Sequence, residues 1–550
     1  MPIDPKFARF YKNRSVAPAP VVSDIRALMR ARAEARPQLP VFQPSEQQTA
    51  FFDWIERGKG NALLNAKAGA GKSTTLIRAT ALMKGSIFLG AYNKDAVIDL
   101  KAKAQETGLA RPELFIATCH GYGYTNWRRT HKNVELVDNK VQRLIKDLAQ
   151  ESADIRIDLQ RSSVFVSKMV SFGKQFLIGA DDHPAIENVN VWRKLVTHFS
   201  ADQDLPPEVE VDAALEWVQE ISRRSAGACE HTIDFDDMLY APIKFNTRLF
   251  PNDWALLDEA QDANRARRVM IRRMMKHTSR AVFCGDRWQA IYGFTGAGGD
   301  SIDRIIEEFD CAELPLSVSY RCARSVVAYA QQWVPDIEAA PTAPEGIVRP
   351  VVAQEADAPK TPWFLREAAA PEDAVLCRYT RPLVTTAYAM LRAGVACKIA
   401  GRDVGKNLIN LARMWRIKSL DKLDERLDTW LDNEIAKAAK LDSEKRRQEA
   451  EDRVATLRIF MARTREKGVH TIDGLVEEIE SLFADKAEGV LTLCTGHKAK
   501  GREWKRVFWI RAAQRRPPQQ EWEAQEESNI NYVIATRAKF EMVFVPEKEE

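Results

Sequence analysis

A run of small residues that ends in a lysine and two hydroxyl residues carries the strongest chemical signal in this sequence. The apolar run 62–64 precedes it, and 75–80 follows with a helix-like composition. Strand, glycine-rich turn and helix are the context of a phosphate-binding loop, in which backbone N–H groups and a helix N-terminus surround a phosphate. We expect Lys72 to reach the β- and γ-phosphates of ATP and Ser73 to ligate Mg²⁺, although Ala66 replaces the first glycine of the general pattern. The predicted nucleotide-binding residues of this loop are Ala66, Lys67, Ala68, Gly69, Ala70, Gly71, Lys72, Ser73 and Thr74.

A second apolar run, 254–257, ends in the acidic sequence Asp-Glu-Ala-Gln-Asp at 258–262. A buried strand that brings adjacent carboxylates to its C-terminal end suits the crevice of a parallel sheet. Asp258 is expected to hold Mg²⁺, directly or through water, and Glu259 to orient and deprotonate an attacking water. A solvated acidic turn is the alternative for such a sequence taken alone, but its combination with the lysine-containing loop favours a nucleotide site.

Three further segments supply polar and aromatic residues for the same chemistry. Gln289 is expected to sense a γ-phosphate, while Tyr292 and Phe294 present aromatic faces on which DNA bases stack without regard to sequence. Core packing is the alternative for two aromatic residues in a turn. Arg321 and Arg537 lie on separate segments, and a guanidinium aimed at the γ-phosphate stabilises transition-state charge, whereas most arginines form surface ion pairs.

The polar segment 495–504 precedes another apolar run, 507–510. Glu503 is suited to accept a hydrogen bond from a ribose hydroxyl. Thr495 and His497 are suited to bond to a nucleic-acid backbone.

Composition sets limits on the class of protein. The 550 residues are 29% charged and 45% hydrophobic, which is typical of a soluble globular chain with several domains. Because the net charge is only +4, a nucleic-acid surface has to be local. Residues 1–39 are basic and read either as a DNA-contacting arm or, preferably, as a solvated tail. The eight cysteines show no metal-binding spacing, which fits a reducing cytoplasm, and no signal peptide or membrane span is evident.

Apolar runs alternate with helical segments along the chain, which favours an α/β fold with parallel sheets. The predicted strands are 86–89, 114–117, 280–284, 374–377 and 507–510, besides the two runs named above. Residues 122–230 are mainly helical in pattern and separate the phosphate loop from the acidic box, so we predict an insertion in the first sheet. A second insertion, 405–485, is densely charged and repeats apolar residues every four positions, which predicts long, solvent-exposed helices, a solvated arm without a specific partner being the favoured interpretation.

In this order the segments resemble the motifs of the UvrD/Rep-like helicases of superfamily 1, over about residues 42–545. The resemblance assigns adenine recognition to Gln48, with Gln47 as the alternative register, and packing against adenine to Tyr320. It makes Arg321 and Arg537 the arginine fingers. It also assigns contacts with single-stranded DNA to Tyr92, Asn93, Thr118, His120, Tyr292, Phe294, Thr495 and His497. Phe294 departs from the tryptophan that is commoner in the family.

The resemblance implies an α/β fold with two RecA-like parallel-sheet motor domains and ATP between them. The predicted parts are a basic arm at 1–39, a first motor domain at 40–121 and 231–315, a helical insertion at 122–230, a second motor domain at 316–404 and 486–550, and a reduced accessory insertion at 405–485. This insertion is far shorter than the accessory domain of the large family members. The compact layout is similar to phage-borne or F-box-type relatives.

The implied function is an ATP- and Mg²⁺-dependent DNA helicase that moves on single-stranded DNA, by family resemblance from 3′ to 5′, and acts at junctions of single and double strands. The implied location is the cytoplasm of a bacterial or phage-infected cell, in association with the nucleoid. Two alternatives stay open: a related motor of opposite polarity or one that strips proteins without unwinding, and an ATP-gated DNA-binding protein that does not move. RNA as a substrate is disfavoured but open, because base stacking does not read the 2′-OH.

Overall fold

The computed structural model of the chain describes residues 42–291, 300–350, 370, 372–392, 394–440, 444–484, 490–511 and 521–546. The basic segment 1–39 and the aromatic residues Tyr292 and Phe294 therefore lie outside the described residues. The predictions made for them stay predictions.

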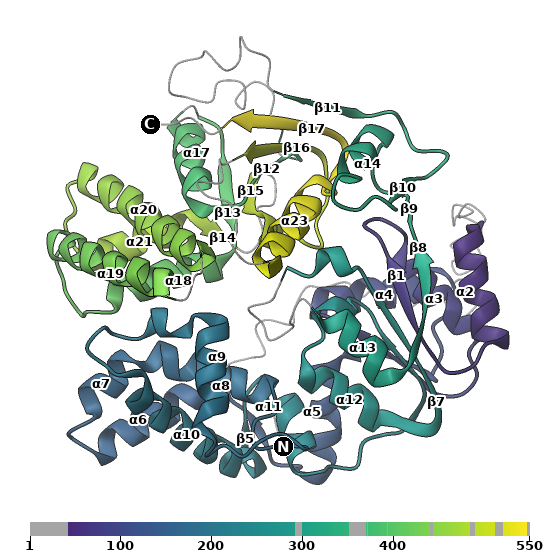
Figure 1. Cartoon of the computed structure of the whole chain (residues 1–550), viewed down its shortest axis with the longest axis horizontal. Coiled ribbons are helices and arrows are strands. Elements are labelled where there is room, and N and C mark those ends of the chain that lie inside the picture. Colours follow the sequence, from purple (N-terminus) through teal and green to yellow (C-terminus); the bar gives the residue numbers. More distant parts are fainter. Residues whose placement is uncertain are drawn as a thin grey trace, which may run out of the picture. The chain divides into compact units, whose positions relative to one another are not determined.

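A six-stranded parallel sheet organises the first half of the chain (Figure 1). Its strand order is β3-β2-β6-β7-β1-β8. The strands are β1 (Asn61–Ala66), β2 (Ile87–Ala91), β3 (Leu114–Thr118), β6 (Asn252–Leu257), β7 (Met275–Gly285) and β8 (Cys311–Leu316). The apolar runs of this half are all part of these strands, which confirms the expected α/β class.

Both faces of this sheet are buried, as is usual where helices cover a parallel sheet. Neighbouring strand residues point to opposite sides: Leu63 packs in a core with α5, α11, α12 and α13, and Leu64 in a core with α3 and α4. The helices of this half outside the insertion are α2 (Glu46–Arg57), α3 (Lys72–Ala79), α4 (Lys94–Glu106), α11 (Asp237–Lys244), α12 (Arg265–Met274) and α13 (Ser301–Phe309).

The first insertion is helical and lies between β3 and β6 in the chain, as its pattern predicts. Its helices are α5 (Cys119–Thr130), α6 (Lys140–Glu151), α7 (Arg156–Arg161), α8 (Ser163–Gln175), α9 (Val189–Phe199) and α10 (Val211–Gly227). A short parallel pair, β4 (Glu135–Leu136) and β5 (Thr232–Ile233), joins its two ends. The insertion has its own core around Phe165 and Trp192, both fully buried.

A seven-stranded parallel sheet organises the second half, in the order β11-β17-β16-β12-β15-β13-β14. Its strands are β11 (Ile347–Pro350), β12 (Ala374–Cys377), β13 (Cys397–Ala400), β14 (Phe483–Ala484), β15 (Leu491–Thr495), β16 (Trp504–Arg511) and β17 (Ala538–Pro546), and a separate pair is formed by β9 (Val318–Ser319) and β10 (Glu338–Ala339). The helices that cover it are α14 (Arg324–Ala330), α17 (Thr380–Arg392), α22 (Gly496–Ala499) and α23 (Glu521–Ala535).

The predicted domain limits remain predictions, and two strands do not fit them. β8 ends at Leu316, one residue beyond the limit of 315, and β14 is an edge strand of the second sheet although the sequence places it within 405–485. We call the parts of the chain built round the two sheets the first and the second lobe.

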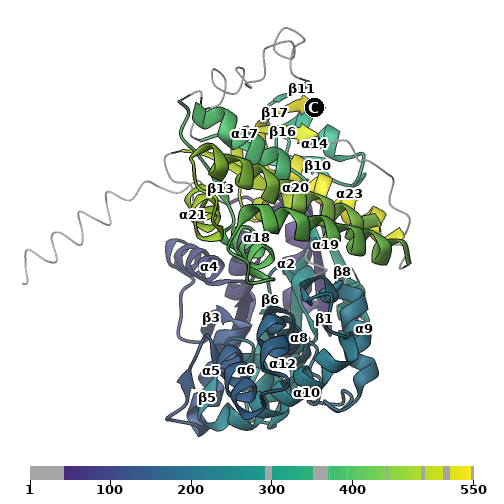
Figure 2. The ribbon, with the colours of Figure 1, turned by 90° about the vertical axis from the view of Figure 1, so that its left-hand side faces the viewer.

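The second insertion is not the solvated arm that its charge density suggests. It consists of α18 (Arg402–Arg413), α19 (Leu420–Lys440), α20 (Glu444–Glu466) and α21 (Ile472–Leu482), and Figure 2 shows α19 and α20 side by side. Leu423 and Leu427 on α19 and Phe460 on α20 are fully buried in one core with β12 and β13. The favoured interpretation was therefore wrong: one face of these helices continues the core of the second lobe.

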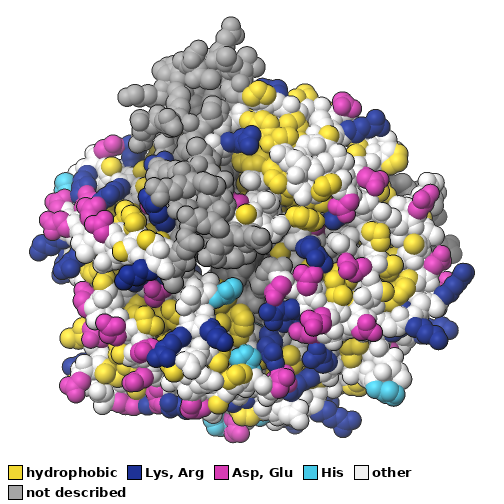
Figure 3. Space-filling view, in the orientation of Figure 1, with side chains coloured by type: hydrophobic (Ala, Val, Ile, Leu, Met, Phe, Trp, Pro, Cys, Tyr) yellow, Lys and Arg dark blue, Asp and Glu magenta, His cyan; other side chains and the backbone are white. Residues whose placement is uncertain are grey.

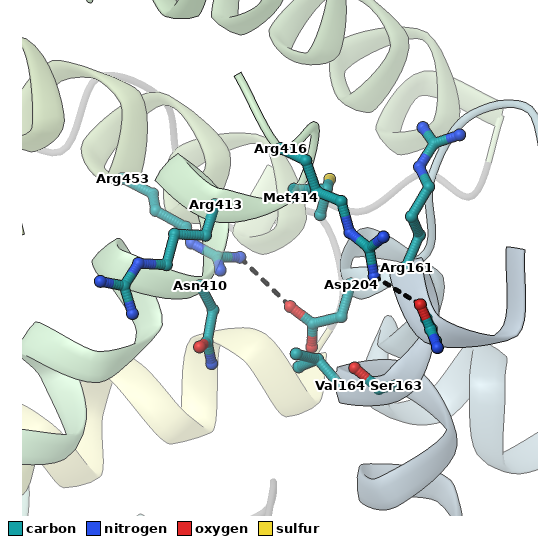
Figure 4. A pocket seen from close by; sticks show the side chains of 10 residues that line it. Arg161, Ser163, Val164, Asp204, Asn410, Arg413, Met414, Arg416 and Arg453 are labelled. Atoms are coloured by element: carbon teal, nitrogen blue, oxygen red, sulfur yellow. Dashed lines mark hydrogen bonds and ion pairs between the residues drawn. The ribbon is translucent and has the colours of Figure 1, made fainter. Parts of the chain in front are cut away.

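The two insertions also contact one another through charged side chains. Arg446 on α20 is fully buried, and its guanidinium donates to both oxygens of Asp202 at 2.8 and 2.9 Å and to Glu434 at 2.8 Å. Close by, Figure 4 shows a pocket that residues of both insertions line, where Arg416 donates to Gln160 at 3.0 Å. The charged surface of α20 thus has a specific partner within the chain, the first insertion.

The surface in view in Figure 3 carries lysine and arginine interspersed with aspartate and glutamate, consistent with a net charge of +4. All eight cysteines are free thiols, and most are buried as small apolar side chains. No helix among the described residues is long and apolar enough to cross a bilayer.

Candidate nucleotide and nucleic-acid site

Three neighbouring strands of the first sheet bring the predicted nucleotide residues to one edge. β1, β7 and β6 are parallel, with Asn65 opposite Gly285 and Leu257 opposite Phe283. Their carboxyl ends therefore lie together, and the residues that follow them meet there: the phosphate loop after β1, the acidic box after β6 and Asp286 after β7. This is the position at which open α/β sheets bind ligands.

The phosphate loop has the backbone that its glycines predict. Gly69 and Gly71 have φ angles of +76° and +75°, which residues with a Cβ adopt only at a cost, and α3 begins directly after Gly71 at Lys72. Ala66 lies in regular strand β1 opposite Leu316, so a methyl group is accommodated where the general pattern has glycine.

Lysine and carboxylates meet at the base of this loop. Lys72 Nζ lies 3.1 Å from both oxygens of Glu259, and Ser73 Oγ donates to Asp258 at 3.2 Å. Burial alone lowers the pKa of Lys72, but Glu259 and Asp258 outweigh it and hold the pKa above its ordinary value, so the ammonium stays charged. Burial raises the pKa of Glu259, yet the attraction to Lys72 keeps it below its ordinary range as a carboxylate.

The acidic box is suited to a hard cation. Burial, followed by repulsion from the neighbouring Glu259, raises the pKa of Asp258, which accepts hydrogen bonds from Ser73 Oγ and the Glu259 backbone N–H. Its oxygens and the Ser73 hydroxyl are the ligand types that Mg²⁺ prefers. Glu259 itself has φ +53°, a left-handed conformation that is uncommon for a residue other than glycine and is often found at functional sites.

Two residues that the sequence analysis did not single out link Glu259 to Gln289. Gln261 Nε2 donates to Glu259 at 2.6 Å, and Gln261 Oε1 accepts from the Asp286 backbone N–H at 3.1 Å. The Asp286 carboxylate in turn accepts from Gln289 Nε2 at 2.7 Å. The predicted γ-phosphate sensor is therefore buried within a hydrogen-bonded chain that ends at the predicted base.

Arg321 lies beside the phosphate loop although it belongs to the second lobe. The Tyr320 backbone N–H donates to Gly69 O at 2.9 Å, and a Cβ built on Gly69 would lie 2.6 Å from Arg321 Cβ. The guanidinium pairs with Glu503 at 2.6 Å, so the residue predicted to bind ribose holds the predicted finger here. The Tyr320 side chain is half exposed, in keeping with an adenine-packing surface.

Arg537 is fully buried within the second lobe. Its guanidinium donates to Val533 O at 2.9 Å and to Arg502 O at 3.2 Å. Burial, followed by repulsion from Arg321, lowers the pKa of Arg537 to about 10. Arg537 thus lies inside the second lobe, held by backbone carbonyls of its own lobe.

Further contacts join the two lobes around this edge. Lys500 Nζ lies 2.7 Å from Asp262 and donates to Gln289 O at 2.7 Å, while Asn529 Nδ2 donates to Ala290 O at 2.9 Å. The sequence places Lys500 in a motif but gives no indication of this partner, because the contact depends on how the lobes fold together.

Gln48 lies in the first turn of α2. Its side-chain oxygen accepts from the Ser45 backbone N–H at 3.0 Å, and Ser45 Oγ accepts from the Gln48 backbone N–H at 3.2 Å. The two bonds together make a reciprocal helix cap. Recognition of adenine by Gln48 stays a prediction.

Four of the predicted DNA contacts lie at one edge of the first sheet. Ala91 is opposite Thr118 in the parallel register of β2 and β3, so Tyr92 and Asn93 are near Thr118 and His120. Asn93 Oδ1 accepts from the N–H of Ala96 at 2.8 Å, and Thr118 Oγ1 accepts from that of Gly121 at 2.9 Å. Both side chains serve as helix N-caps, a structural role that the sequence analysis did not separate from DNA binding.

The exposed ring at this edge is Phe235 and not His120. His120 is buried, and burial followed by the charge of Arg267 lowers its pKa to about 3, so the imidazole is neutral. Its ring stacks on that of Phe235 at 4.1 Å, and Phe235 is 54% exposed. Tyr92 lies under the Arg267 guanidinium at 4.8 Å. Residues 234–238 resemble the Asp-Phe segment that precedes the acidic box in the helicase family, but the sequence does not show that the Phe235 ring is exposed.

Two more of the predicted DNA contacts, Thr495 and His497, belong to the second lobe. Thr495 ends β15 opposite Cys377, and His497 lies in the short helix α22 that follows, 4.0 Å from Glu526. They are thus placed at the carboxyl edge of the second sheet, as the first four are at that of the first.

Comparison with known proteins agrees with the fold. The UvrD/REP helicase N-terminal domain matches residues 46–310, and the UvrD-like helicase C-terminal domain matches residues 372–549. The chain therefore belongs to the UvrD/Rep-like helicase family of superfamily 1.

Individual relatives are distant. The chain is 24% identical over 279 residues to the ATP-dependent DNA helicase Rep of Buchnera aphidicola, covering 46% of this chain and 39% of that protein. It is 22% identical to DNA helicase II of Escherichia coli, over 50% of this chain and 38% of that one, and 23% identical to the ATP-dependent DNA helicase PcrA of Staphylococcus epidermidis, over 52% and 39%. The matched segments span about two fifths of the length of these relatives.

Proposed function

We propose that this protein is an ATP-dependent DNA helicase that moves along single-stranded DNA from 3′ to 5′ and separates duplex DNA at junctions. One observation supports the proposal: Lys72 bonds to Glu259 and Ser73 to Asp258 at one edge of the first sheet, and Arg321 of the second lobe lies against Gly69 of the phosphate loop. The names of the relatives, all DNA helicases, support DNA as the polymer.

The geometry supports a hydrolytic mechanism with residues of both lobes. The triphosphate replaces Glu259 as the partner of Lys72, which frees the carboxylate to orient a water and take its proton. The water oxygen bonds to the γ-phosphorus as the bond to the β–γ bridging oxygen breaks, giving ADP and phosphate. Asp258 and Ser73 would hold Mg²⁺, which supplies charge neutralisation at the phosphates.

The arginines make the reaction depend on the relation between the lobes. Arg321 leaves Glu503 and binds the γ-phosphate. Arg537, whose pKa burial lowers, then binds the γ-phosphate as well. Loss of the γ-phosphate removes the anion that joins both arginines to the phosphate loop, so the lobes separate. Contacts on each sheet edge then hold DNA alternately, which gives directional steps.

The DNA-binding surface that we propose runs over the edge formed by Tyr92 and Phe235 and on to Thr495 and His497. Exposed aromatic rings stack on bases of any sequence, as a translocating motor requires. We further propose a cytoplasmic location in a bacterial cell, in association with its DNA.

The test is strand separation with duplexes that carry a 3′ or a 5′ single-stranded tail, with and without ATP, and with Lys72→Ala as the inactive control. ATP-dependent opening of the 3′-tailed duplex alone supports the proposal. Opening of the 5′-tailed duplex alone contradicts the polarity. Movement without strand separation, or DNA binding with neither movement nor rapid ATP turnover, contradicts the helicase activity.

A further inference from the structure

A tyrosine of the second lobe reaches into the phosphate loop of the first. Tyr532 lies on α23 and is fully buried. Its hydroxyl accepts from the Ala68 backbone N–H at 2.9 Å, although the two residues are 464 positions apart in the chain. The hydroxyl also donates to the Asp286 carboxylate at 3.2 Å. Both partners belong to the nucleotide-binding edge of the first lobe.

These two bonds distinguish Tyr532 from an ordinary core aromatic. Packing alone is satisfied by phenylalanine, whereas a buried hydroxyl is costly unless both its donor and its acceptor functions are used. Here both are used, and both lead to the predicted nucleotide edge: the phosphate loop and the carboxylate that binds Gln289.

The same residue is firmly connected to Arg537. The Tyr532 carbonyl accepts from the backbone N–H and the hydroxyl of Thr536, at 3.0 and 2.8 Å. Thr536 Oγ1 accepts from the Arg537 guanidinium at 3.1 Å, and Arg537 Nε donates to Val533 O at 2.9 Å. These hydrogen bonds link the ends of the segment 532–537, which carries the tyrosine hydroxyl at one end and the guanidinium at the other.

A second route leads from Tyr532 to the predicted base. The Asp286 carboxylate binds the tyrosine hydroxyl, its backbone N–H binds Gln261, and Gln261 binds Glu259. Hydrogen bonds therefore connect this one hydroxyl to the phosphate loop, the γ-phosphate sensor and the base. The helix segment that carries the hydroxyl also carries the second arginine.

We propose that Tyr532 is a positioning residue that transmits the position of the phosphate loop to Arg537, so that the arginine reaches the nucleotide only when the loop is filled. This inference rests on the proposed ATPase function. Tyr532 touches neither nucleotide nor water in this account; it acts through the Ala68 N–H and through the segment that carries the guanidinium. Loss of its hydroxyl should impair turnover and leave nucleotide binding by the first lobe nearly intact.

The first experiment measures Tyr532→Phe in the full chain. We expect kcat for ATP hydrolysis with saturating single-stranded DNA to fall by at least about tenfold, while the Kd for a fluorescent ATP analogue changes by less than about threefold. Tyr329→Phe is the matched control, because Tyr329 packs against Trp333 and Phe544 in the second lobe and faces aromatic side chains instead of the phosphate loop. The control should keep wild-type kcat, and a thermal melt verifies that both variants fold.

The second experiment repeats Tyr532→Phe in an Arg537→Ala background. If the tyrosine acts through this arginine, its removal changes kcat there by less than about twofold, because residues that act as a unit are not additive. A full additional loss, or a single variant with wild-type kcat, overturns the inference. The proposed function fails separately, if the wild-type protein itself hydrolyses no ATP with DNA present.

Discussion

At the scale of residues, the proposed site is a set of charged side chains suited to bind a polyanion. Lys72 pairs with Glu259, Arg321 pairs with Glu503, and Arg537 lies buried near a like charge. A triphosphate would bind these cations more strongly than their present partners do, since phosphate oxygens offer lysine and arginine more acceptors than a carboxylate does.

Replacement of the predicted base gives the sharpest result at this scale. Glu259→Gln keeps the hydrogen bond to Gln261 in reach but removes the group that takes a proton. We expect DNA-stimulated ATP turnover to fall by about 10²–10⁴-fold while nucleotide binding persists. Glu307→Gln, on the exposed side of α13, is the control and should have no effect. Turnover within about twofold of wild type would show that Glu259 is not the base.

The exposed ring of Phe235 gives a prediction for DNA binding. Phe235→Ala should weaken binding of a fluorescent single-stranded oligonucleotide by about 1–3 kcal/mol, the value of one stacked base, and leave ATP hydrolysis without DNA unchanged. Phe250→Ala is a matched control, since Phe250 is 46% exposed but lies against Arg129. Equal affinities for wild type and Phe235→Ala would remove this ring from the DNA path.

At the scale of elements, α20 shows how charge density and burial combine. Arg446 is fully buried, although it lies in the most charged stretch of the chain, because Asp202 from the other insertion and Glu434 from α19 satisfy its guanidinium. Removing Arg446 leaves the carboxylates of Asp202 and Glu434 with Lys437 alone, 3.5 and 3.3 Å away, which costs more than the loss of a surface pair.

Arg446→Ala should therefore lower the free energy of unfolding by about 3–5 kcal/mol in a urea titration. Arg447→Ala, one residue along the same helix, removes a partly buried pair with Glu451 within one helix and should cost less, about 1 kcal/mol. If both variants unfold at the same urea concentration, the contact between the insertions contributes nothing to stability.

The sequence predicts those parts of the fold that depend on local pattern. Continuous apolar runs mark the buried strands, and the phosphate loop is evident because its glycines are needed at φ angles near +75°. Contacts made by distant parts of the chain leave no such trace. The hydroxyl of Tyr532 on Ala68, the stacking of Phe235 on His120 and the burial of Arg446 all depend on partners in other elements. The interpretation of 405–485 failed for this reason. The high charge density favoured a solvated arm, and the core that the apolar face of these helices joins includes other elements.

At the scale of the whole molecule, residues of both lobes make up the proposed nucleotide site. Within 42–291 the chain supplies the phosphate loop, the acidic box and Gln289, and after residue 316 it supplies Arg321, Lys500, Tyr532 and Arg537. Only an arrangement in which both contribute links ATP turnover to a relative movement, and hence to a step along DNA.

The most direct measurement is ATP turnover by Arg321→Ala with single-stranded DNA, together with its affinity for a fluorescent nucleotide. We predict a loss of about 10³-fold or more in kcat with affinity retained within about tenfold, because the guanidinium of the second lobe acts on the transition state. Wild-type turnover by this variant would mean that Arg321 does not act on the transition state, which contradicts the role proposed for the second lobe.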